Sequence, residues 1–164
     1  MLIGLISDTH GYMDPRVPPA LVGVERILHA GDVGSQAVLD ALAEIAPVIA
    51  VCGNNDEPLG CLGLPRHVDE EIERVRIHLV HRLVDATPSP DTRVVVYGHS
   101  HKALIAEREA TLYVNPGAAG RVGFHRQITV ALLRIEAGRC DAELIMVGPR
   151  LPADRKRSVP SRSS

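Results

Sequence analysis

The chain has 164 residues, of which 45% are apolar and 23% are charged, proportions that are ordinary for a folded domain. Its formal net charge is −2, so no overall positive field attracts a polyanion. Only 2% of the residues are aromatic, which argues against base-stacking platforms for single-stranded nucleic acid, and we expect no stable nucleic-acid partner. No stretch approaches 18 apolar residues, so we also expect no membrane span.

The N-terminal run "LIGLIS" (2–7) predicts a first buried strand. A signal peptide is not indicated, because no basic region precedes the run and Asp8 follows it at once. The three cysteines are odd in number and widely spaced, so they indicate neither a disulfide framework nor a zinc ribbon. Cys52 ends an apolar run, and we interpret it as a small buried side chain. Free cysteines fit a reducing compartment, so we expect a cytoplasmic protein.

Strands and helices alternate in the first half of the chain. Residues 26–32 and 47–56 contain two more apolar runs that end in glycine and polar residues. Between them, residues 35–45 place apolar side chains at helical spacing after a serine that can cap a helix. Segment 16–24 contains two prolines, so a helix there is expected to be short and to begin at the prolines. This alternation predicts parallel strands joined by crossover helices.

The second half is mostly β, and we therefore predict two sheets that face each other with helices outside. We place the whole fold in one domain, residues 1–150. The remaining segment, 151–164, is rich in Pro, Ser and Arg, and we expect a disordered tail there. The predicted strands of this half lie at 66–72, 75–81, 93–98, 103–109, 111–115, 127–135 and 141–147.

Polar residues with metal-binding side chains follow five of the predicted strands. In α/β sheets, ligands gather outside the carboxyl ends of strands. A mixture of carboxylates, amides and imidazoles suits Mn, Fe, Zn, Co or Ni better than calcium or a thiolate-bound metal. The residues are Asp8 and His10 after the first strand, Asp32 after the second, Asn54, Asn55 and Asp56 after the third, and His81, His99 and His101 after later strands.

Two dications held close together need a bridging anion, and Asp32 is our candidate for it. A water between such cations would lose its proton near neutral pH and attack a bound phosphorus in line. The glycines before Asp32, Asn54 and His99 allow tight turns and a close approach of the backbone. The catalytic residues that we expect are Asn54, Asn55, Asp56 and His81.

The ordered motifs "SDTHG", "HAGD", "CGNND", "VH", "YGHSH" and "VNPG" resemble those of the calcineurin-like metallophosphoesterase superfamily. The resemblance covers about residues 1–148 and is strongest to small single-domain phosphodiesterases of bacteria and archaea. It implies an α/β fold, a four-layer α/β/β/α sandwich of two facing mixed sheets with flanking helices. It also implies two divalent transition-metal ions, with Mn the first candidate and Fe, Zn, Ni or Co the alternatives. One ion would be held by Asp8, His10, Asp32 and His101, and the other by Asp32, Asn54, His81 and His99.

Three positions depart from the family pattern. Many relatives have histidine where this chain has Asn55, and an asparagine cannot donate a proton as a general acid. We therefore predict a dependence on good leaving groups or on metal-bound water as the acid. Arg82 follows His81 where glycine is usual, and it could face the substrate phosphate or solvent. The segment after it is short, so a helix common in relatives is expected to be missing. Ala118 replaces a serine, and the role of the lost hydroxyl is not evident from the sequence.

Other polar residues have simpler interpretations. Asp56 is expected to orient a ligand histidine by accepting a hydrogen bond from it. The alternative for Asn54 is a residue of an asparagine-rich turn. His29 lies inside a strand, and we interpret it as a core residue whose ring nitrogens have hydrogen-bond partners. Three histidines are given surface or structural roles: His67, His78 and His125.

The sequence thus predicts a dinuclear-metal-dependent phosphohydrolase, in first place a phosphodiesterase for small phosphodiesters or nucleotides, with a hydroxide between the metals as nucleophile. Small substrates are favoured because no insertion is present to clamp a polymer. Two alternatives stay open, a phosphomonoesterase and a non-catalytic scaffold that binds protein partners, as one subunit of the eukaryotic retromer coat does with this fold. A protein phosphatase or a nuclease is less favoured because extra domains are absent. A homo-oligomer that buries a sheet edge also stays open.

Overall fold

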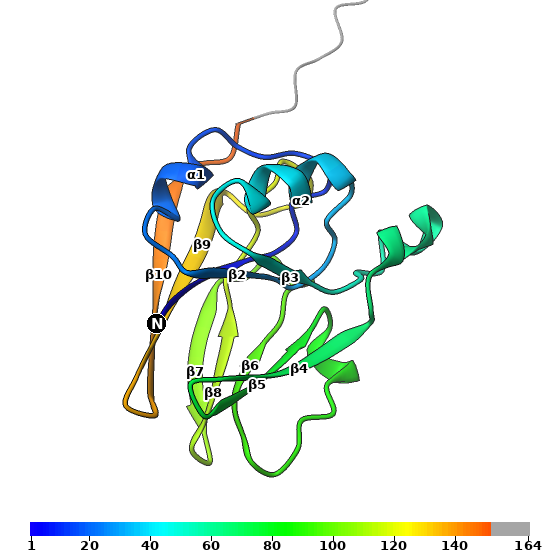
Figure 1. The fold of residues 1–164 in the computed structure, drawn as a ribbon. Helices are drawn as coiled ribbons and strands as arrows, with labels where there is room; N and C mark the ends of the chain where they lie inside the picture. Colours follow the sequence, from blue (N-terminus) through cyan, green and yellow to red (C-terminus); the bar gives the residue numbers. More distant parts are fainter. Residues whose placement is uncertain (152–164) are drawn as a thin grey trace, which may run out of the picture.

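Two five-stranded mixed sheets face each other in the computed structural model, which describes residues 1–151 (Figure 1). Most of the tail expected at 151–164 therefore lies outside the described residues. The first sheet has the order β10-β9-β1-β2-β3, formed by β1 (Leu2–Ile6), β2 (Arg26–His29), β3 (Val48–Ala50), β9 (Gln127–Glu136) and β10 (Arg139–Pro149). The second has the order β4-β5-β6-β8-β7, formed by β4 (His67–Ile72), β5 (Val75–Val80), β6 (Thr92–Val96), β7 (Leu104–Arg108) and β8 (Thr111–Asn115). The predicted pair of facing mixed sheets is confirmed.

The two α-helices lie against the outer face of the first sheet (Figure 1). Helix α1 (Val17–Ala20) is short and has a proline in its first turn, as predicted, and α2 (Gln36–Ala43) buries Val38 and Leu42. The outer face of the second sheet is covered differently. There Val80, Val95 and Tyr97 pack against a loop that contains only the short 3-10 helix η2 (Leu83–Asp85). A second 3-10 helix, η1 (Glu57–Gly63), follows β3. The missing helix after Arg82 was expected from the shortness of that segment.

The main core lies between the sheets, and a second core lies between the first sheet and the helices. Strand β1 shows how one sequence serves both, because successive side chains of a strand point to opposite faces. Ile3 and Leu5 belong to the core between the sheets, whereas Ile6 belongs to the core under the helices. A central strand buried on both faces needs an uninterrupted apolar run, which is what residues 2–6 provide.

Parallel pairing brings the polar segments after the strands to one rim of the sandwich. Strands β1, β2 and β3 are parallel to one another in the first sheet, as are β5, β6 and β8 in the second. Backbone hydrogen bonds join the segments that follow, including Asp8 N–H to the Gly31 carbonyl at 3.0 Å and Gly98 N–H to the His81 carbonyl at 2.9 Å. The rim is therefore a hydrogen-bonded framework and not a set of free loops.

One cysteine prediction was wrong. Cys52 is joined to Cys61 by a disulfide, because η1 turns the chain back until the two Cα atoms are 5.1 Å apart. The turn depends on left-handed backbone at Gly60, Cys61 and Leu62, which the sequence pattern did not indicate. Cysteine usage therefore gives no support for a reducing compartment.

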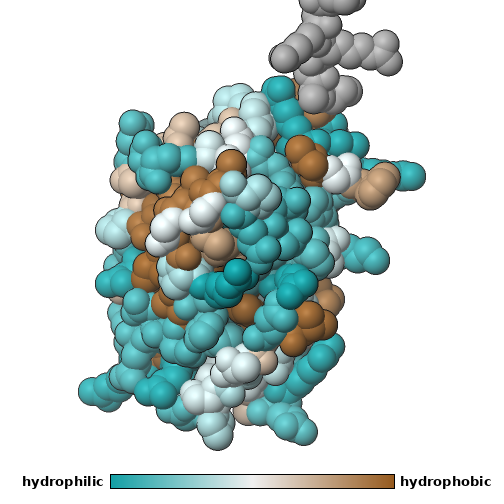
Figure 2. All heavy atoms as spheres, turned by 90° about the vertical axis from the view of Figure 1, so that its right-hand side faces the viewer, coloured by the Kyte–Doolittle hydropathy of each residue, from teal (hydrophilic) through white to brown (hydrophobic). Residues whose placement is uncertain are grey.

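The face that carries β3, η1 and β4 is mostly hydrophilic, with its apolar side chains gathered in patches of limited size (Figure 2). Among residues 1–151, no helix is long and apolar enough to cross a membrane.

Candidate metal centre

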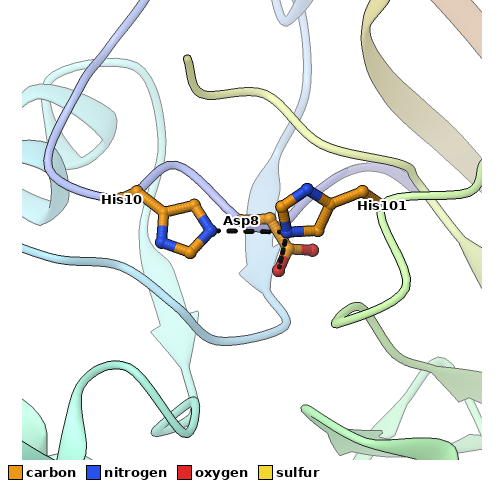
Figure 3. Close-up of side chains that lie close together, drawn as sticks. All are labelled: Asp8, His10 and His101. Carbon is orange, nitrogen blue, oxygen red and sulfur yellow. Dashed lines mark hydrogen bonds and ion pairs between the residues drawn. The ribbon is translucent and has the colours of Figure 1, made fainter. Parts of the chain in front are cut away.

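The seven side chains predicted as metal ligands come together at the rim, in two groups. The first, which we call the Asp8 group, consists of Asp8, His10 and His101 (Figure 3). Nε2 of His101 lies 3.2 Å from Oδ1 of Asp8 and 3.4 Å from Nε2 of His10. Donor atoms bonded to one cation at about 2.1 Å lie roughly 3.0–3.4 Å apart along the edges of an octahedron or a tetrahedron. The spacing of the Asp8 group matches that of a cation's coordination shell.

The second, the Asn54 group, consists of Asp32, Asn54, His81 and His99. Oδ1 of Asn54 lies 2.9 Å from Nδ1 of His99 and 3.0 Å from Nε2 of His81. Nε2 of His81 is in turn 3.4 Å from Oδ2 of Asp32. Four donor atoms from four separate segments of the chain therefore converge at the same kind of spacing.

Asp32 lies between the two groups. Its Oδ2 is 3.4 Å from Nε2 of His81 and 3.7 Å from Nε2 of His10. Asn55 holds both carboxylate oxygens, with its backbone N–H 2.8 Å from Oδ1 and its side-chain amide 2.6 Å from Oδ2. Burial alone would raise the pKa of Asp32, but the hydrogen bonds from His81 and Asn55 outweigh it and hold this pKa below its ordinary value. Asp32 is therefore an anion placed between two clusters of nitrogen ligands.

The orientation of His101 follows from His125, for which the sequence predicted only a surface or structural role. Nε2 of His125 faces the Gly120 carbonyl at 2.9 Å, and a carbonyl only accepts, so this nitrogen carries the proton. Burial lowers the pKa of His125, which keeps its ring neutral and leaves Nδ1 as an acceptor. Nδ1 of His101, 3.3 Å away, must then be the donor. Nε2 of His101 consequently presents a lone pair to the interior of the Asp8 group.

This lone pair faces an oxygen that has no partner. Oδ1 of Asp8 is buried and accepts no hydrogen bond from the described residues, although Nε2 of His101 is only 3.2 Å away. Two electron-rich atoms at this separation repel each other unless a positive charge lies beside them. The residues present therefore fit a cation at the Asp8 group.

His81 is oriented by the backbone. Its Nδ1 donates to the Ala30 carbonyl at 2.7 Å, which directs Nε2 toward Asn54 and Asp32. Burial lowers the pKa of His81, but the Asp32 carboxylate offsets this and raises it above the ordinary value. An outer hydrogen bond of this kind fixes the ring of a metal-binding histidine.

Residues 1–138 match the protein family described as "Calcineurin-like phosphoesterase superfamily domain". The chain belongs to this superfamily. A probable metallophosphoesterase of Methanothermobacter thermautotrophicus is 37% identical over 165 residues, which cover 90% of this chain and 94% of the relative. A phosphodiesterase of Methanocaldococcus jannaschii is 31% identical over 139 residues, 71% of this chain and 83% of the relative. Metal dependence is a property of the family, and this chain is a metallophosphoesterase at the family level.

Solved structures agree on the fold. The structure of an archaeal phosphodiesterase has a TM-score of 0.71 against this chain. The two are 27% identical, and the match covers 88% of this chain and 100% of that one. The structure of Vps29 from Entamoeba histolytica has a TM-score of 0.72 at 21% identity and covers 89% of this chain and 99% of that chain. At this identity the likeness to Vps29 shows a shared fold and leaves the function open.

The backbone of this phosphoesterase superfamily member is unusual at the ligands. The left-handed region is sparsely populated by residues other than glycine, and holding such a residue there costs of order 1–3 kcal/mol. Backbone of this kind clusters at functional sites, where the surroundings hold it in place. Five of the seven predicted ligands adopt it: Asp8 (φ 56°), His10 (49°), Asp32 (54°), His99 (67°) and His101 (57°).

Neighbouring glycines allow this geometry. A Cβ on Gly53 would collide with Asp32, and a Cβ on Gly98 would lie 2.8 Å from Oδ2 of Asp8. The close backbone approach predicted for the glycines before the ligands is confirmed at both positions.

A buried histidine supports the loops beneath both groups. His29 is fully buried, and burial lowers its pKa to about 4, so the ring is neutral. Its Nδ1 accepts from the Gly31 backbone at 3.2 Å. Its Nε2 lies 2.9 Å from the hydroxyl of Thr9, which in turn donates to the Val33 carbonyl at 2.9 Å. The reading of His29 as a satisfied core residue is confirmed.

The expected partner of Asp56 was wrong. This carboxylate is fully buried and accepts three backbone N–H groups, from Val33 at 3.0 Å, Gly34 at 2.8 Å and Gly53 at 2.9 Å. It was expected to orient a ligand histidine, but the nearest donors are peptide groups of the loops after β2 and β3. Asp56 therefore fixes the loops that carry Asp32 and Asn54 and is too deeply buried to contact a substrate.

Four further residues have clear positions in the structure. His78 is buried and pairs with Asp69 at 2.9 Å, which is a structural role, and His67 is exposed on β4. Asn115 donates to the Gly98 carbonyl and to the hydroxyl of Ser100, both at 3.0 Å, and so fastens the loop between β6 and β7 that carries two ligands. Ala118 is fully buried, and nothing in the structure explains the loss of the hydroxyl.

Two hollows flank the ligand cluster. The first, which we call the His81 cavity, has a volume of about 310 Å³, and its walls include Asn54, His81, Arg66 and Arg82. Arg82 therefore faces this hollow, where it donates to Asp85 at 2.6 Å. The second, the Phe124 cavity, has a volume of about 370 Å³ and is lined by His99, Ser100, His101, Lys102, Gly123, Phe124 and His125. Each hollow shares two predicted ligands with the centre.

Proposed function

We propose that this chain is a dinuclear-metal-dependent phosphohydrolase, in first place a phosphodiesterase for small diesters or nucleotides. The observation that carries the proposal is the position of Oδ2 of Asp32, within 3.7 Å of a nitrogen ligand in each group. One ion would be held by Asp8, His10, Asp32 and His101, and a second by Asp32, Asn54, His81 and His99. Mn is the first candidate, and Fe, Zn, Ni or Co are alternatives because the ligands are nitrogen and oxygen atoms.

When bound, two such cations supply an activated water molecule as nucleophile and neutralise charge on the phosphoryl oxygens. The chain supplies the positioning. Asn55 holds Asp32 through both carboxylate oxygens, His125 directs Nε2 of His101 inward, and the Ala30 carbonyl does the same for His81. Small substrates are favoured because the two hollows that flank the centre among residues 1–151 have volumes of about 310 and 370 Å³.

The proposal is tested by stripping the protein with a chelator and adding single divalent metals back. We expect hydrolysis of bis(p-nitrophenyl) phosphate to disappear on chelation and to return with metal. Asp32→Asn should reduce turnover to background while circular dichroism shows the native fold. Asp40→Asn is the matched control, since Asp40 is an exposed helix residue whose side chain bonds only Gln36 among the contacts described. Full turnover by Asp32→Asn would remove the bridging role, and a chelated protein with full activity would remove the metal.

The absence of a histidine at position 55 predicts a dependence on the leaving group. Asn55 donates to Asp32 and has no proton to give to a departing alkoxide. We therefore expect a p-nitrophenyl diester to be cleaved far faster than an alkyl diester of similar size. Steady-state rates on the matched pair check this, and equal rates would show that another acid protonates the leaving group.

The alternative of a protein-binding scaffold rests on the fold shared with Vps29. A scaffold has no need of metal ligands, whereas this chain fills all seven positions and holds five of them in strained backbone. A protein without metal-dependent hydrolysis in the assay above would favour the scaffold.

A further inference from the structure

Phe124 is the only phenylalanine of the chain, and its side chain is fully exposed. Exposing an aromatic ring to water forgoes the free energy that its burial would give. The ring does not lie on a distant surface. It lines the Phe124 cavity together with His99 and His101, two of the proposed metal ligands.

The position of Phe124 is fixed by its neighbours on both sides. Gly123 has a φ of 118°, and a Cβ there would collide with the ring of His101. On the other side, His125 bonds to His101 and to the Gly120 carbonyl. The loop is therefore anchored against the Asp8 group, and only the side chain of Phe124 projects between two anchored residues.

The two hollows beside the centre differ in chemistry. The His81 cavity is walled by the ion pairs Arg66–Glu57 and Arg82–Asp85, each at 2.6 Å. The Phe124 cavity instead offers an apolar ring, with Lys102 as the one lysine or arginine among its lining residues. A phosphodiester has two ester substituents that leave the phosphorus in different directions, whereas a monoester has one. Two unlike hollows beside one phosphate position match a diester with one polar and one flat apolar substituent.

We propose that the Phe124 cavity is a subsite for a planar aromatic substituent of the phosphodiester, of which a nucleobase is the biological example, and that this group stacks on Phe124. Stacking suits this wall because every nucleobase offers a flat face to an aromatic ring, whatever the pattern of hydrogen-bond donors and acceptors on its edges. Lys102 places a positive charge at the same wall, which would attract an anionic phosphate. This inference rests on the proposed function, because the cavity matters only if the phosphate lies at the metal centre.

Phe124 provides its own reporter. In the Zn²⁺-loaded protein, ring-labelled phenylalanine gives NMR signals from this residue alone. The probes are methyl phenylphosphonate and methyl methylphosphonate, which are not hydrolysed and differ only in the phenyl group. We expect the phenyl compound to shift the Phe124 ring signals upfield by stacking, and the methyl compound to leave them in place.

Calorimetry on variants completes the test. Phe124→Ser should weaken binding of methyl phenylphosphonate about 5- to 150-fold, the range for losing one stacked base, and leave methyl methylphosphonate unchanged. Phe124→Tyr should restore the affinity. Val122→Ser is the matched control, because Val122 is exposed in the same loop but does not line the cavity.

The two possible failures are distinguishable. Equal affinity of the wild type for both probes, or an unchanged affinity in Phe124→Ser, would overturn the subsite and leave the metal centre intact. Failure of both probes to bind, together with no metal-dependent hydrolysis of any diester, would overturn the proposed function and the subsite with it.

Discussion

The Asp8 group and the Asn54 group lie side by side but differ in how far the chain itself satisfies their atoms. In the Asn54 group, Oδ1 of Asn54 lies within hydrogen-bonding distance of both imidazoles, and His81 also pairs with Asp32. In the Asp8 group, Oδ1 of Asp8 has no hydrogen-bond partner and faces the lone pair of His101. The Asn54 group is held together by its own hydrogen bonds, whereas the Asp8 group has the His10–His101 contact but leaves Oδ1 of Asp8 without a partner.

This difference separates two contributions to a metal site. Where ligands form hydrogen bonds to one another, a cation must break those bonds in order to bind. Their loss offsets part of the free energy of cation binding. Where the ligands repel one another, the chain has already accepted an unfavourable arrangement, and a cation relieves it. Paired aspartate substitutions in the two groups should therefore have opposite effects on the metal-free protein.

The largest expected effect is that of Asp8→Asn. An amide keeps the oxygen that accepts from the His99 backbone at 3.1 Å and turns the unpartnered oxygen into a donor toward Nε2 of His101. Affinity for the first cation should fall by more than about 100-fold, since even outer partners of ligands are worth 10- to 100-fold. The metal-free protein should become more stable by about 1–3 kcal/mol, because a buried unsatisfied group is gone.

Asp32→Asn is the contrast. It removes the carboxylate that pairs with His81 and accepts from Asn55, so the metal-free protein should lose stability, again by about 1–3 kcal/mol. Isothermal titration with Mn²⁺ gives the affinities, and urea unfolding after chelation gives the stabilities. A shift of the same sign in both variants would show that the two groups do not differ as described.

A smaller effect is expected from the partner of His101. In His125→Leu, Nδ1 of His101 loses its acceptor, and its ring is free to take the other tautomer. Cation affinity of the Asp8 group should fall about 10- to 100-fold. His125→Asn should recover most of it, because an asparagine oxygen can accept near the position of Nδ1.

The matched control for this variant is Arg126→Leu, an exposed neighbour in the same loop. A merely structural role of His125 would lower the melting temperature of the chelated protein and leave the affinity for Mn²⁺ as it was. That result, or a His125→Asn variant no better than His125→Leu, would remove the positioning role.

The convergence of the candidate ligands at one rim could be predicted because their signals are local. Each of Asp8, Asp32 and Asn54 directly follows an apolar strand, and parallel pairing of those strands is enough to bring their carboxyl ends to one rim. The left-handed backbone at the ligands carries no such signal beyond the glycines beside them. The missing outer helix could also be predicted, since the segment between β5 and β6 is too short to hold one.

The residues that were missed depend on the path of loops. His125 meets His101 only because the loop after β8 folds back over the rim, and the two are 24 positions apart in sequence. Cys61 reaches Cys52 only through the left-handed turn of η1. Asp56 was recognised as important, but its partners are peptide groups of two loops, and a sequence does not reveal which peptide groups point inward.

The smallest expected effect tests the support that the two groups share. His29 touches Thr9 beneath the Asp8 group and Gly31 beside Asp32, and its pKa of about 4 lies below the ordinary value of 6.5 because the ring is buried. Between these pH values the unfolded chain binds a proton that the folded chain does not, so stability is complete above pH 6.5 and is lost as the pH falls toward 4. From pH 7 to pH 5 the loss should be about 2 kcal/mol for this group.

Urea unfolding of the chelated protein, compared with His29→Gln at each pH, separates the contribution of His29 from that of the other histidines. Because Gln does not titrate, the stability difference between the two proteins should shrink by that amount on acidification. A difference that stays constant with pH would mean that folding does not lower the pKa of His29, and that the ring is not held as a neutral bridge between the two groups.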